Sequence, residues 1–252
     1  MLHLNGISQV VTADVYSQKM KKTIPVLIIK APSIDTIKNV VYLLHGYGGA
    51  PESWLDFKRL LLKTSKQHNV LFVAPDGGNN SYYLDAKTNS QVQYETFIVK
   101  ELPIHIDTSY FLAKNFKKVI IGHSMGGYGA FRLALIYKSY NFAGAISGVM
   151  DLTASSNKEE IINLLVEDTV NGLDVLDKNS VMHYVSSQSK DTTYYEFICG
   201  RRDYLAEGNK ELAKLFKEKK FNFRYTQTRF GRHTYRYFKK QFPKLLEAFI
   251  TR

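Results

Sequence analysis

A serine at the end of an apolar run is the residue of this chain best suited to covalent chemistry. The run 119–121 (VII) stops at Gly122, Ser124 follows, and Gly126 closes the pentapeptide GHSMG before a helical pattern begins. This Gly-x-Ser-x-Gly spacing is typical of a sharp strand-to-helix turn, because larger side chains two positions from the serine would collide. Such a turn exposes the serine hydroxyl, so the sequence predicts a nucleophile at Ser124.

A serine hydroxyl is a weak nucleophile, and it needs a neighbouring base that is itself held by an acidic partner. Downstream of Ser124 the chain contains only two histidines, His183 and His233. His233 follows the last predicted strand, where this architecture places its base, whereas His183 lies in a predicted insertion. We predict that His233 is the base and keep His183 as the alternative.

The acidic partner should lie between the serine and the histidine in the chain order Ser, Asp or Glu, His. The aspartates in that interval include Asp151, Asp174, Asp177, Asp191 and Asp203. Only Asp203 lies directly after a predicted buried strand and before a helix. We predict Asp203 as the partner, with Asp151 as the fallback and a helix-capping role as the alternative for Asp203.

A glycine-rich loop, HGYGG at 45–49, follows the apolar strand 39–44. It is not a phosphate loop, since no Gly-Lys-Ser/Thr follows, and the dinucleotide pattern G-x-G-x-x-G fails at Pro51. We predict instead that the backbone amides of Tyr47 and Met125 form an oxyanion hole. An ordinary glycine turn is the alternative.

The pocket for a substrate should open at the carboxyl ends of the strands, where α/β sheets bind their ligands. The loop 79–85 (NNSYYLD) follows a predicted buried strand, and the glycine loop and the serine turn follow two others. The tyrosines of this loop could equally be packing residues, and His45 could brace the glycine loop. The residues predicted to contact substrate are His45, Gly46, His123, Tyr82 and Tyr83.

Strand-like and helical patterns alternate along the chain, which predicts an α/β fold with a mostly parallel, twisted sheet of about eight strands and helices on both faces. The first two strands should form an antiparallel edge joined by a hairpin at 19–22, and Pro103 should kink its helix. The predicted strands are 7–16, 25–30, 39–44, 70–74, a strand from 118, 143–147, 193–199 and 221–228. The predicted helices are 56–68, 94–106, the helix after Ser124, 158–166, 209–219 and 235–250.

The alternation of strands and helices stops at 151–190, where one predicted amphipathic helix is followed by Asn171-Gly172 and a polar stretch up to Ser189. We interpret this segment as a lid over the site within a single domain covering 1–252, not as a separate domain. The chain has 252 residues, of which 44% are hydrophobic and 13% aromatic, enough for a substantial core.

The net charge of +11 raises the alternative of nucleic-acid binding. The basic residues are mostly scattered over predicted helix faces and accompany no nucleic-acid motif, so a solvated basic surface is the favoured interpretation. One cluster surrounds His233 and could attract an anionic substrate. Its members are Arg229, Arg232, Arg236, Lys239 and Lys240.

Other features of the sequence limit which cofactors and which cellular compartment we expect. Cys199 is the only cysteine, so no intrachain disulfide can form, which fits a reducing compartment. The first residues lack a signal-peptide pattern and no stretch is long enough to span a membrane, so we expect a cytoplasmic protein. Without a His-Glu-x-x-His motif or a Cys/His cluster, we expect neither a metal nor a cofactor. The sequence leaves open whether the chain forms homo-oligomers.

Six motifs, in this order along nearly the whole chain, resemble those of the esterase D/S-formylglutathione hydrolase-like group of α/β-hydrolases. That group includes tributyrin-type esterases and is related to the mycolyltransferase fold. The resemblance implies Ser124, Asp203 and His233 as catalytic residues, the Tyr47 and Met125 amides as oxyanion donors, and hydrolysis of short-chain acyl esters or thioesters by a serine carboxylesterase. The motifs are LLHGYGG at 43–49, PDGGNNSYY at 75–83, YETFIVKELP at 94–103, GHSMGGYGA at 122–130, CGRRDYLAEGN at 199–209 and GRHTYRYF at 231–238.

The chain departs from this family at a few positions near the predicted histidine. Thr234, Tyr235 and Arg236 stand where the family often has a small or acidic residue and then Trp, and Arg201 and Arg202 stand where neutral residues are common. The departures leave the substrate open among acetyl or feruloyl esters on carbohydrate, S-formylglutathione and simple lipid esters. Acyl transfer to an acceptor and a non-catalytic binding module remain rival functions.

Overall fold

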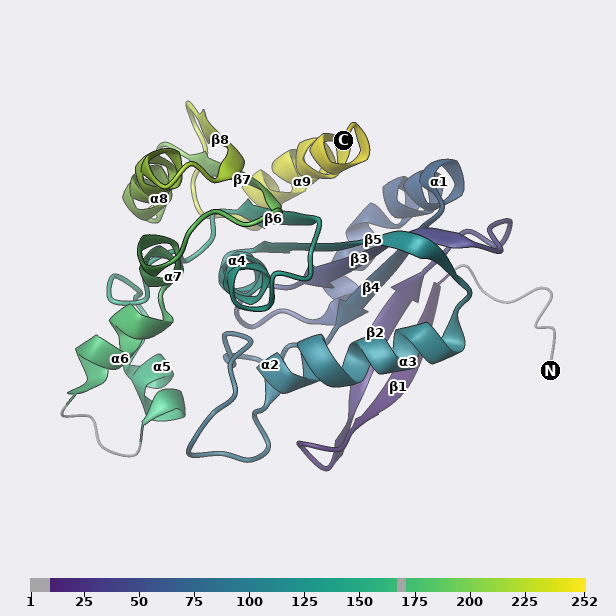
Figure 1. The fold of residues 1–252 in the computed structure, drawn as a ribbon, viewed down its shortest axis with the longest axis horizontal. Coiled ribbons are helices and arrows are strands. Elements are labelled where there is room, and N and C mark those ends of the chain that lie inside the picture. Colours follow the sequence, from purple (N-terminus) through teal and green to yellow (C-terminus); the bar gives the residue numbers. More distant parts are fainter. Residues whose placement is uncertain (1–9, 167–170) are drawn as a thin grey trace.

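The computed structural model of the protein describes residues 10–166 and 171–252. Its centre is an eight-stranded sheet with the order β1-β2-β4-β3-β5-β6-β7-β8 (Figure 1). β2 pairs antiparallel with both β1 and β4, and every other neighbouring pair in this sheet is parallel. The strands are β1 (Val10–Ser17), β2 (Lys22–Ile29), β3 (Ile37–Leu44), β4 (Val70–Pro75), β5 (Leu112–His123), β6 (Phe142–Ile146), β7 (Tyr194–Gly200) and β8 (Asn222–Thr228).

The predicted α/β fold with an antiparallel edge is therefore confirmed. The first predicted strand began at residue 7, but β1 starts at Val10 and residues 7–9 lie outside the described part of the chain. The helices are η1 (Pro51–Phe57, 3-10), α1 (Lys58–His68), α2 (Tyr94–Thr96), η2 (Phe97–Glu101, π-helical), α3 (Leu102–Ser109), α4 (Met125–Tyr137), α5 (Lys158–Leu165), α6 (Gly172–Asn179), α7 (Val181–Ser187), α8 (Ala206–Glu218) and α9 (Tyr235–Ile250).

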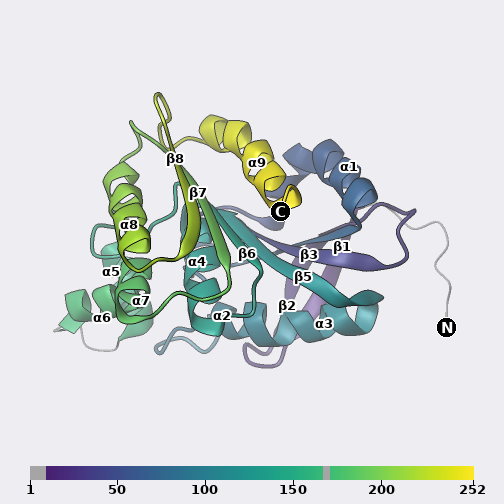
Figure 2. The same ribbon diagram turned by 45° about the horizontal axis from the view of Figure 1, so that its top comes forward.

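Central strands are buried on both faces because alternate side chains feed two separate apolar cores. In β3, Val40 and Tyr42 pack into the core that includes α3, α4 and α8, whereas Val41 and Leu43 pack into the core that includes α1 and α9. Figure 2 shows α8 and α9 on opposite sides of β7 and β8. A strand covered on both faces needs a continuous apolar run, which is what made this strand recognisable in the sequence.

The helix predicted at 94–106 contains a π-helical turn, 97–101, immediately before Pro103. Proline has no amide hydrogen to donate, so a regular α-helical bond is missing at this point. The two glutamates of this helix, Glu95 and Glu101, form contacts that tie it to other elements. Glu95 accepts from Arg132 and Tyr137, and Glu101 accepts from the Ser17 hydroxyl at 2.5 Å.

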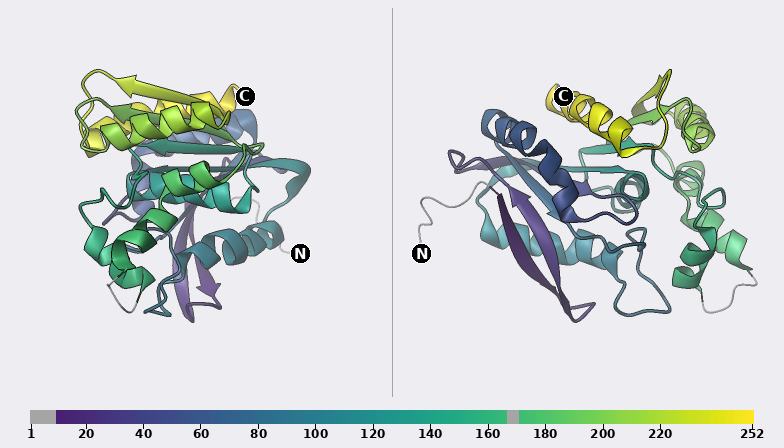
Figure 3. Two further views of the ribbon diagram at one scale, coloured as in Figure 1. Left: turned by 60° about the vertical axis from the view of Figure 1, so that its left-hand side comes forward. Right: turned by 180° about the vertical axis from the view of Figure 1, so that it is seen from behind.

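The segment 171–189, predicted as a polar stretch, instead forms α6 and α7. The two helices span only eight and seven residues and bury few apolar side chains, among them Leu176, Val181 and Val185, so neither repeats its pattern over enough turns to be recognised in the sequence. Asn171 is the N-cap of α6 and Gly172 is its first residue. α7 packs against α4 and α8, and α6 packs against α5 and α7, at one side of the molecule (Figure 3).

The register between neighbouring strands brings the predicted site residues together at the carboxyl edge of the sheet. Leu44, the last residue of β3, lies opposite Gly122 near the end of β5, so the glycine loop and the serine turn start side by side. In the same way Gly200, the last residue of β7, lies opposite Thr228, the last of β8. The loops that carry Asp203 and His233 therefore leave the sheet at one level.

Candidate active site

Ser124 sits at a strained turn between β5 and α4, with φ 53° and ψ −120°. A Cβ atom on Gly122 would lie 2.2 Å from the Gly126 carbonyl oxygen, and one on Gly126 would lie 2.1 Å from the Leu44 carbonyl oxygen. Both approaches are far below van der Waals contact, so only glycine fits at either position. The collisions explain the spacing from which the nucleophile was predicted.

His233 lies in the loop after β8, and its Nε2 is 3.0 Å from the Ser124 hydroxyl oxygen, 109 positions earlier in the chain. Its Nδ1 lies 3.1 Å and 3.2 Å from the two carboxylate oxygens of Asp203. A carboxylate only accepts, so the ring proton sits on Nδ1 and leaves Nε2 free to accept the serine proton. The structure thus brings all three predicted residues into one hydrogen-bonded chain.

Asp203 is held in place from its own loop. Its side chain is fully buried, and Oδ1 also accepts a hydrogen bond from the Leu205 amide at 2.9 Å. The Arg202 amide donates to the Gly231 carbonyl at 2.9 Å, which ties this loop to the loop of His233. Backbone bonds therefore fix the carboxylate against the imidazole without help from a bound ligand.

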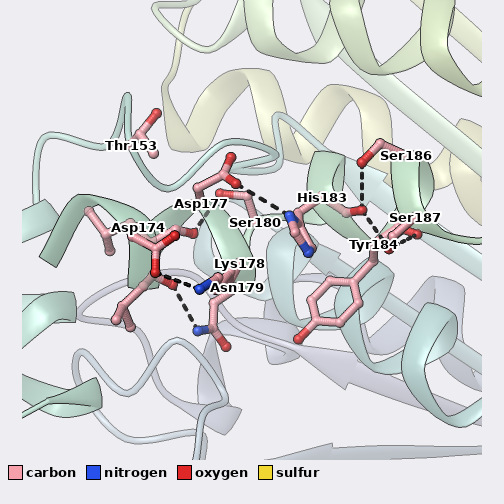
Figure 4. Close-up of polar contacts among 12 residues, drawn as sticks. Thr153, Asp174, Asp177, Lys178, Asn179, Ser180, His183, Tyr184, Ser186 and Ser187 are labelled. Carbon is pink, nitrogen blue, oxygen red and sulfur yellow. Dashed lines mark hydrogen bonds and ion pairs between the residues drawn. The ribbon is translucent and has the colours of Figure 1, made fainter. Parts of the chain in front are cut away.

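The alternatives kept from the sequence have other partners. Asp151 accepts from the Thr153 amide and hydroxyl, at 2.8 Å and 2.7 Å. His183, on α7, pairs through Nδ1 with Asp177 at 3.3 Å, within a local network of the insertion (Figure 4). Within the described residues neither contacts Ser124.

The two predicted oxyanion donors flank the serine from different elements. Met125 is the first residue of α4, so its amide belongs to the unpaired N–H groups of a helix N-terminus. The neighbouring glycine loop is fixed because the Gly48 amide donates to the Asn79 carbonyl and the Gly49 amide to the Gly46 carbonyl. In the described part of the chain, neither the Tyr47 amide nor the Met125 amide donates to a protein acceptor.

A cleft of about 510 Å³ opens over Ser124, a volume typical of small-molecule sites. Of the residues predicted to contact substrate, three line it: Gly46, His123 and Tyr82. The cleft also contains residues that sequence reasoning did not single out, because nothing in their type or spacing shows which way their side chains point. Among these are Ser53, Ile146, Ser147, Val149, Tyr204 and Tyr237.

His45 and Tyr83 lie behind the cleft wall, which differs from the prediction that they contact substrate. Both are fully buried. The Gly77 amide donates to His45 Nε2 at 2.8 Å, so Nδ1 carries the proton and donates to the Gly46 carbonyl, also at 2.8 Å. The Tyr83 hydroxyl donates to the His45 carbonyl at 2.9 Å. These side chains brace the glycine loop, the alternative raised for His45.

Two further groups of the site are kept uncharged by their surroundings. Burial, assisted by the nearby His45 and His233 rings, lowers the pKa of His123 from 6.5 to about 3, so this ring is neutral near neutral pH. It stacks on Phe238 with 3.9 Å between ring centroids. Burial, reinforced by the charge of Asp203, raises the pKa of the Cys199 thiol to about 12, which makes that thiol a poor rival nucleophile.

Of the described residues of the insertion, only those in its first part meet the cleft. Residues 155–157 line the cleft, and Glu160 on α5 accepts from the Tyr47 hydroxyl at 3.1 Å and from the Asn80 amide at 3.4 Å. The hydrogen bond to Glu160 raises the pKa of the Tyr47 phenol. Residues 167–170 of the predicted lid lie outside the described residues.

Neither metal ligands nor a membrane span emerges from the described ranges 10–166 and 171–252. They contain no group of three or more His, Cys, Asp or Glu side chains that could hold a metal ion. None of their helices combines the length and the apolar character needed to cross a bilayer.

Comparison with known proteins agrees with the geometry. Residues 17–249 match the Esterase family model. The chain is 28% identical over 258 residues to an acetyl esterase of Caldicellulosiruptor saccharolyticus, covering 92% of this chain and 94% of the relative.

Solved structures share the fold at lower identity. An S-formylglutathione hydrolase from Agrobacterium tumefaciens has a TM-score of 0.80 at 18% identity, over 96% of this chain and 94% of that one. The MPT51 protein of Mycobacterium tuberculosis has a TM-score of 0.78 at 18% identity, over 97% and 99%. With the family match, these likenesses establish that the chain belongs to the Esterase family and is a serine esterase with the α/β-hydrolase fold.

Proposed function

We propose that Ser124, His233 and Asp203 form a catalytic triad that hydrolyses short-chain acyl esters or thioesters through an acyl-enzyme. The observation that carries the proposal is the continuous chain from Asp203 through Nδ1 and Nε2 of His233 to the Ser124 hydroxyl, with its 3.0 Å link to the nucleophile. This distance lies within the range needed for direct proton transfer.

In the proposed reaction, His233 Nε2 takes the Ser124 proton while Oγ bonds to the acyl carbon, and the carbonyl oxygen becomes an oxyanion. The amides of Tyr47 and Met125 donate to that oxygen. The intermediate collapses by breaking the bond to the alcohol or thiol, which leaves with the proton from His233. Water then attacks the acyl carbon while His233 takes one of its protons, and the second intermediate collapses by breaking the bond to Ser124 Oγ, which takes that proton back from His233 as the acid leaves.

A short acyl group is favoured by the relative that covers nearly the full chain, which is named an acetyl esterase. Similar structures at identities below 25% support the fold and leave the choice of ester open. Hydrolysis is favoured over acyl transfer because the His233 side chain is 24% exposed, which gives water access to the base. A transferase would benefit from a drier site.

A panel of p-nitrophenyl esters and thioesters of graded acyl length tests the proposal. We expect the highest kcat/KM for the shortest acyl groups and at least about a 10³-fold loss of kcat in Ser124→Ala. A fluorophosphonate should label the wild-type chain at Ser124 and leave the variant unlabelled. Comparable turnover in the folded variant, or labelling at another residue, would refute the assignment.

The cytoplasm remains our proposal for where the protein acts. It rests on Cys199, which is the only cysteine in the sequence and therefore cannot form an intrachain disulfide. Fractionation of source cells, with detection of the protein by antibody, tests it. Recovery from an oxidising compartment would contradict it.

A further inference from the structure

A second hollow, of about 450 Å³, lies on the other side of the loop that carries His233. It is formed by the end of β8, the loop after it, and the first half of α9, which Figure 2 shows beside β8. We call it the basic groove. Its lining residues are Thr228, Arg229, Phe230, Gly231, Arg232, Thr234, Arg236, Tyr237, Lys240, Gln241 and Lys244.

The lining of the basic groove carries positive charge and no carboxylate. Five of its residues are exposed cations, and in the described part of the chain none of these forms an ion pair. Lys239 is different, because it points away from the groove and pairs with Asp56 at 2.9 Å. The five unpaired cations are Arg229, Arg232, Arg236, Lys240 and Lys244.

Two guanidinium groups pack on an aromatic ring at the edge of the groove. The guanidinium groups of Arg202 and Arg229 lie 5.3 Å and 5.0 Å from the centre of the exposed Phe230 ring, which holds both beside the groove.

The basic groove and the cleft share a wall. Thr234 and Tyr237 line both hollows. The wall is fixed, since the Thr234 hydroxyl accepts from the Tyr237 amide at 3.2 Å and the Tyr237 hydroxyl lies 2.8 Å from the Thr228 hydroxyl. Thr234 is exposed and borders both hollows, so the path that a substrate would take from Ser124 to the groove crosses this residue.

We propose that the basic groove binds the part of the substrate remote from the ester bond, and that this part carries two or more negative charges as phosphate or carboxylate. The inference rests on the proposed esterase function. Guanidinium groups bind both anions through paired N–H donors, and clustered cations raise the local concentration of an anionic ligand. A hollow of this size suits a compact multivalent anion.

The test uses three acetyl esters that share one alcohol skeleton: one neutral, one bearing a phosphate and one bearing two carboxylates. For the wild type at low salt, we expect kcat/KM at least about tenfold higher for the charged esters, through a lower KM. The preference should shrink at about 0.5 M salt, where screening shortens the reach of charge. The better of the two charged esters identifies the anion.

The variant Arg236→Glu/Lys240→Glu reverses charge on one face of α9 and should abolish the preference while leaving kcat for the neutral ester within about twofold. Its matched control is Lys63→Glu/Lys66→Glu on α1, which changes net charge equally at exposed positions outside the groove. The control should keep the preference. An equal loss in both variants, or no preference in the wild type, would overturn the proposal.

Direct binding separates failure of the groove from failure of the chemistry. We expect pyrophosphate, followed by calorimetry, to bind the wild type and Ser124→Ala equally and the α9 variant at least about tenfold more weakly. If the neutral ester is not hydrolysed but this pattern holds, the esterase proposal fails and the anion site stands. If pyrophosphate does not bind, or if the α9 variant loses affinity only for single-stranded DNA or anionic vesicles, the anion site is refuted.

Discussion

Replacing Asp203 by asparagine should invert the tautomer of His233 while leaving the fold intact. Oδ1 of Asp203 accepts from the Leu205 amide at 2.9 Å, and Oδ2 lies 3.1 Å from His233 Nδ1. Asparagine has a single side-chain oxygen, and we expect it to stay with the Leu205 amide. The new NH₂ group then faces Nδ1, which must accept instead of donate, and the ring proton moves to Nε2.

A proton on Nε2 blocks the step that starts the reaction, because Nε2 can no longer accept the Ser124 proton across the 3.0 Å contact. The buried position of the Asp203 side chain leaves no room for water to restore the original pattern. We expect kcat to fall by about 10³- to 10⁴-fold, which corresponds to about 4–5.5 kcal/mol of barrier. Steady-state hydrolysis of p-nitrophenyl acetate measures the loss.

Asp151→Asn is the matched control, because the hydrogen bonds of Asp151 within the described chain are to Thr153 in its own turn, and Asp151 was the fallback acid in the sequence. Its kcat should stay within about twofold of wild type. Nitrogen chemical shifts of the His233 ring report the tautomer directly. The reasoning is refuted if Asp203→Asn keeps a tenth of the wild-type kcat, if its ring proton remains on Nδ1, or if Asp151→Asn shows the larger loss.

Two further predictions concern groups around the cleft. Glu160→Ala should lower the pKa of the Tyr47 phenol toward its ordinary value, because the hydrogen bond to Glu160 raises that pKa. Spectrophotometric titration of the phenols, with Tyr47→Phe to identify the signal of Tyr47, measures the change. An unchanged pKa would contradict the prediction. The pKa of His123 is about 3 in the folded chain and 6.5 in the unfolded chain. Between these two values only the unfolded chain binds the extra proton, so the free energy of unfolding decreases as the pH falls. The decrease is at most about 1.4 kcal/mol per pH unit, down to about pH 3. Denaturant unfolding at several pH values should show this slope in the wild type and a shallower one in His123→Asn; equal slopes would contradict it.

The strand-to-helix turn at Ser124 and the convergence of the loops at one edge of the sheet could be predicted, because steric and topological constraints determine which residue types occur at these positions. Gly122 and Gly126 are required by collisions of 2.2 Å and 2.1 Å, and no other residue type would fit. Parallel strands end at one edge, so loops after buried strands had to converge there. Ser124, Asp203 and His233 could be chosen on that basis although they are far apart in the chain.

The direction in which a loop side chain points could not be predicted in the same way. His45 and Gly46 are neighbours, yet Gly46 lines the cleft and His45 is buried beneath it. The difference depends on hydrogen bonds from Gly77 and Tyr83, which belong to the loop after another strand. Such cross-loop bonds have no signature in local periodicity. The helices α6 and α7 escaped prediction for another reason, because they span only eight and seven residues.

The basic cluster shows how much the meaning of a charge depends on its partner. In the sequence Lys239 and Lys240 look equivalent, but Lys239 pairs with Asp56 while Lys240 faces the basic groove together with Arg236, four positions earlier on α9. The groove and the cleft lie on opposite sides of one loop, since Thr234 lines both and His233 only the cleft. If the proposed groove binds the substrate, charge changes on α9 alter which esters are preferred without moving the imidazole that we propose activates Ser124.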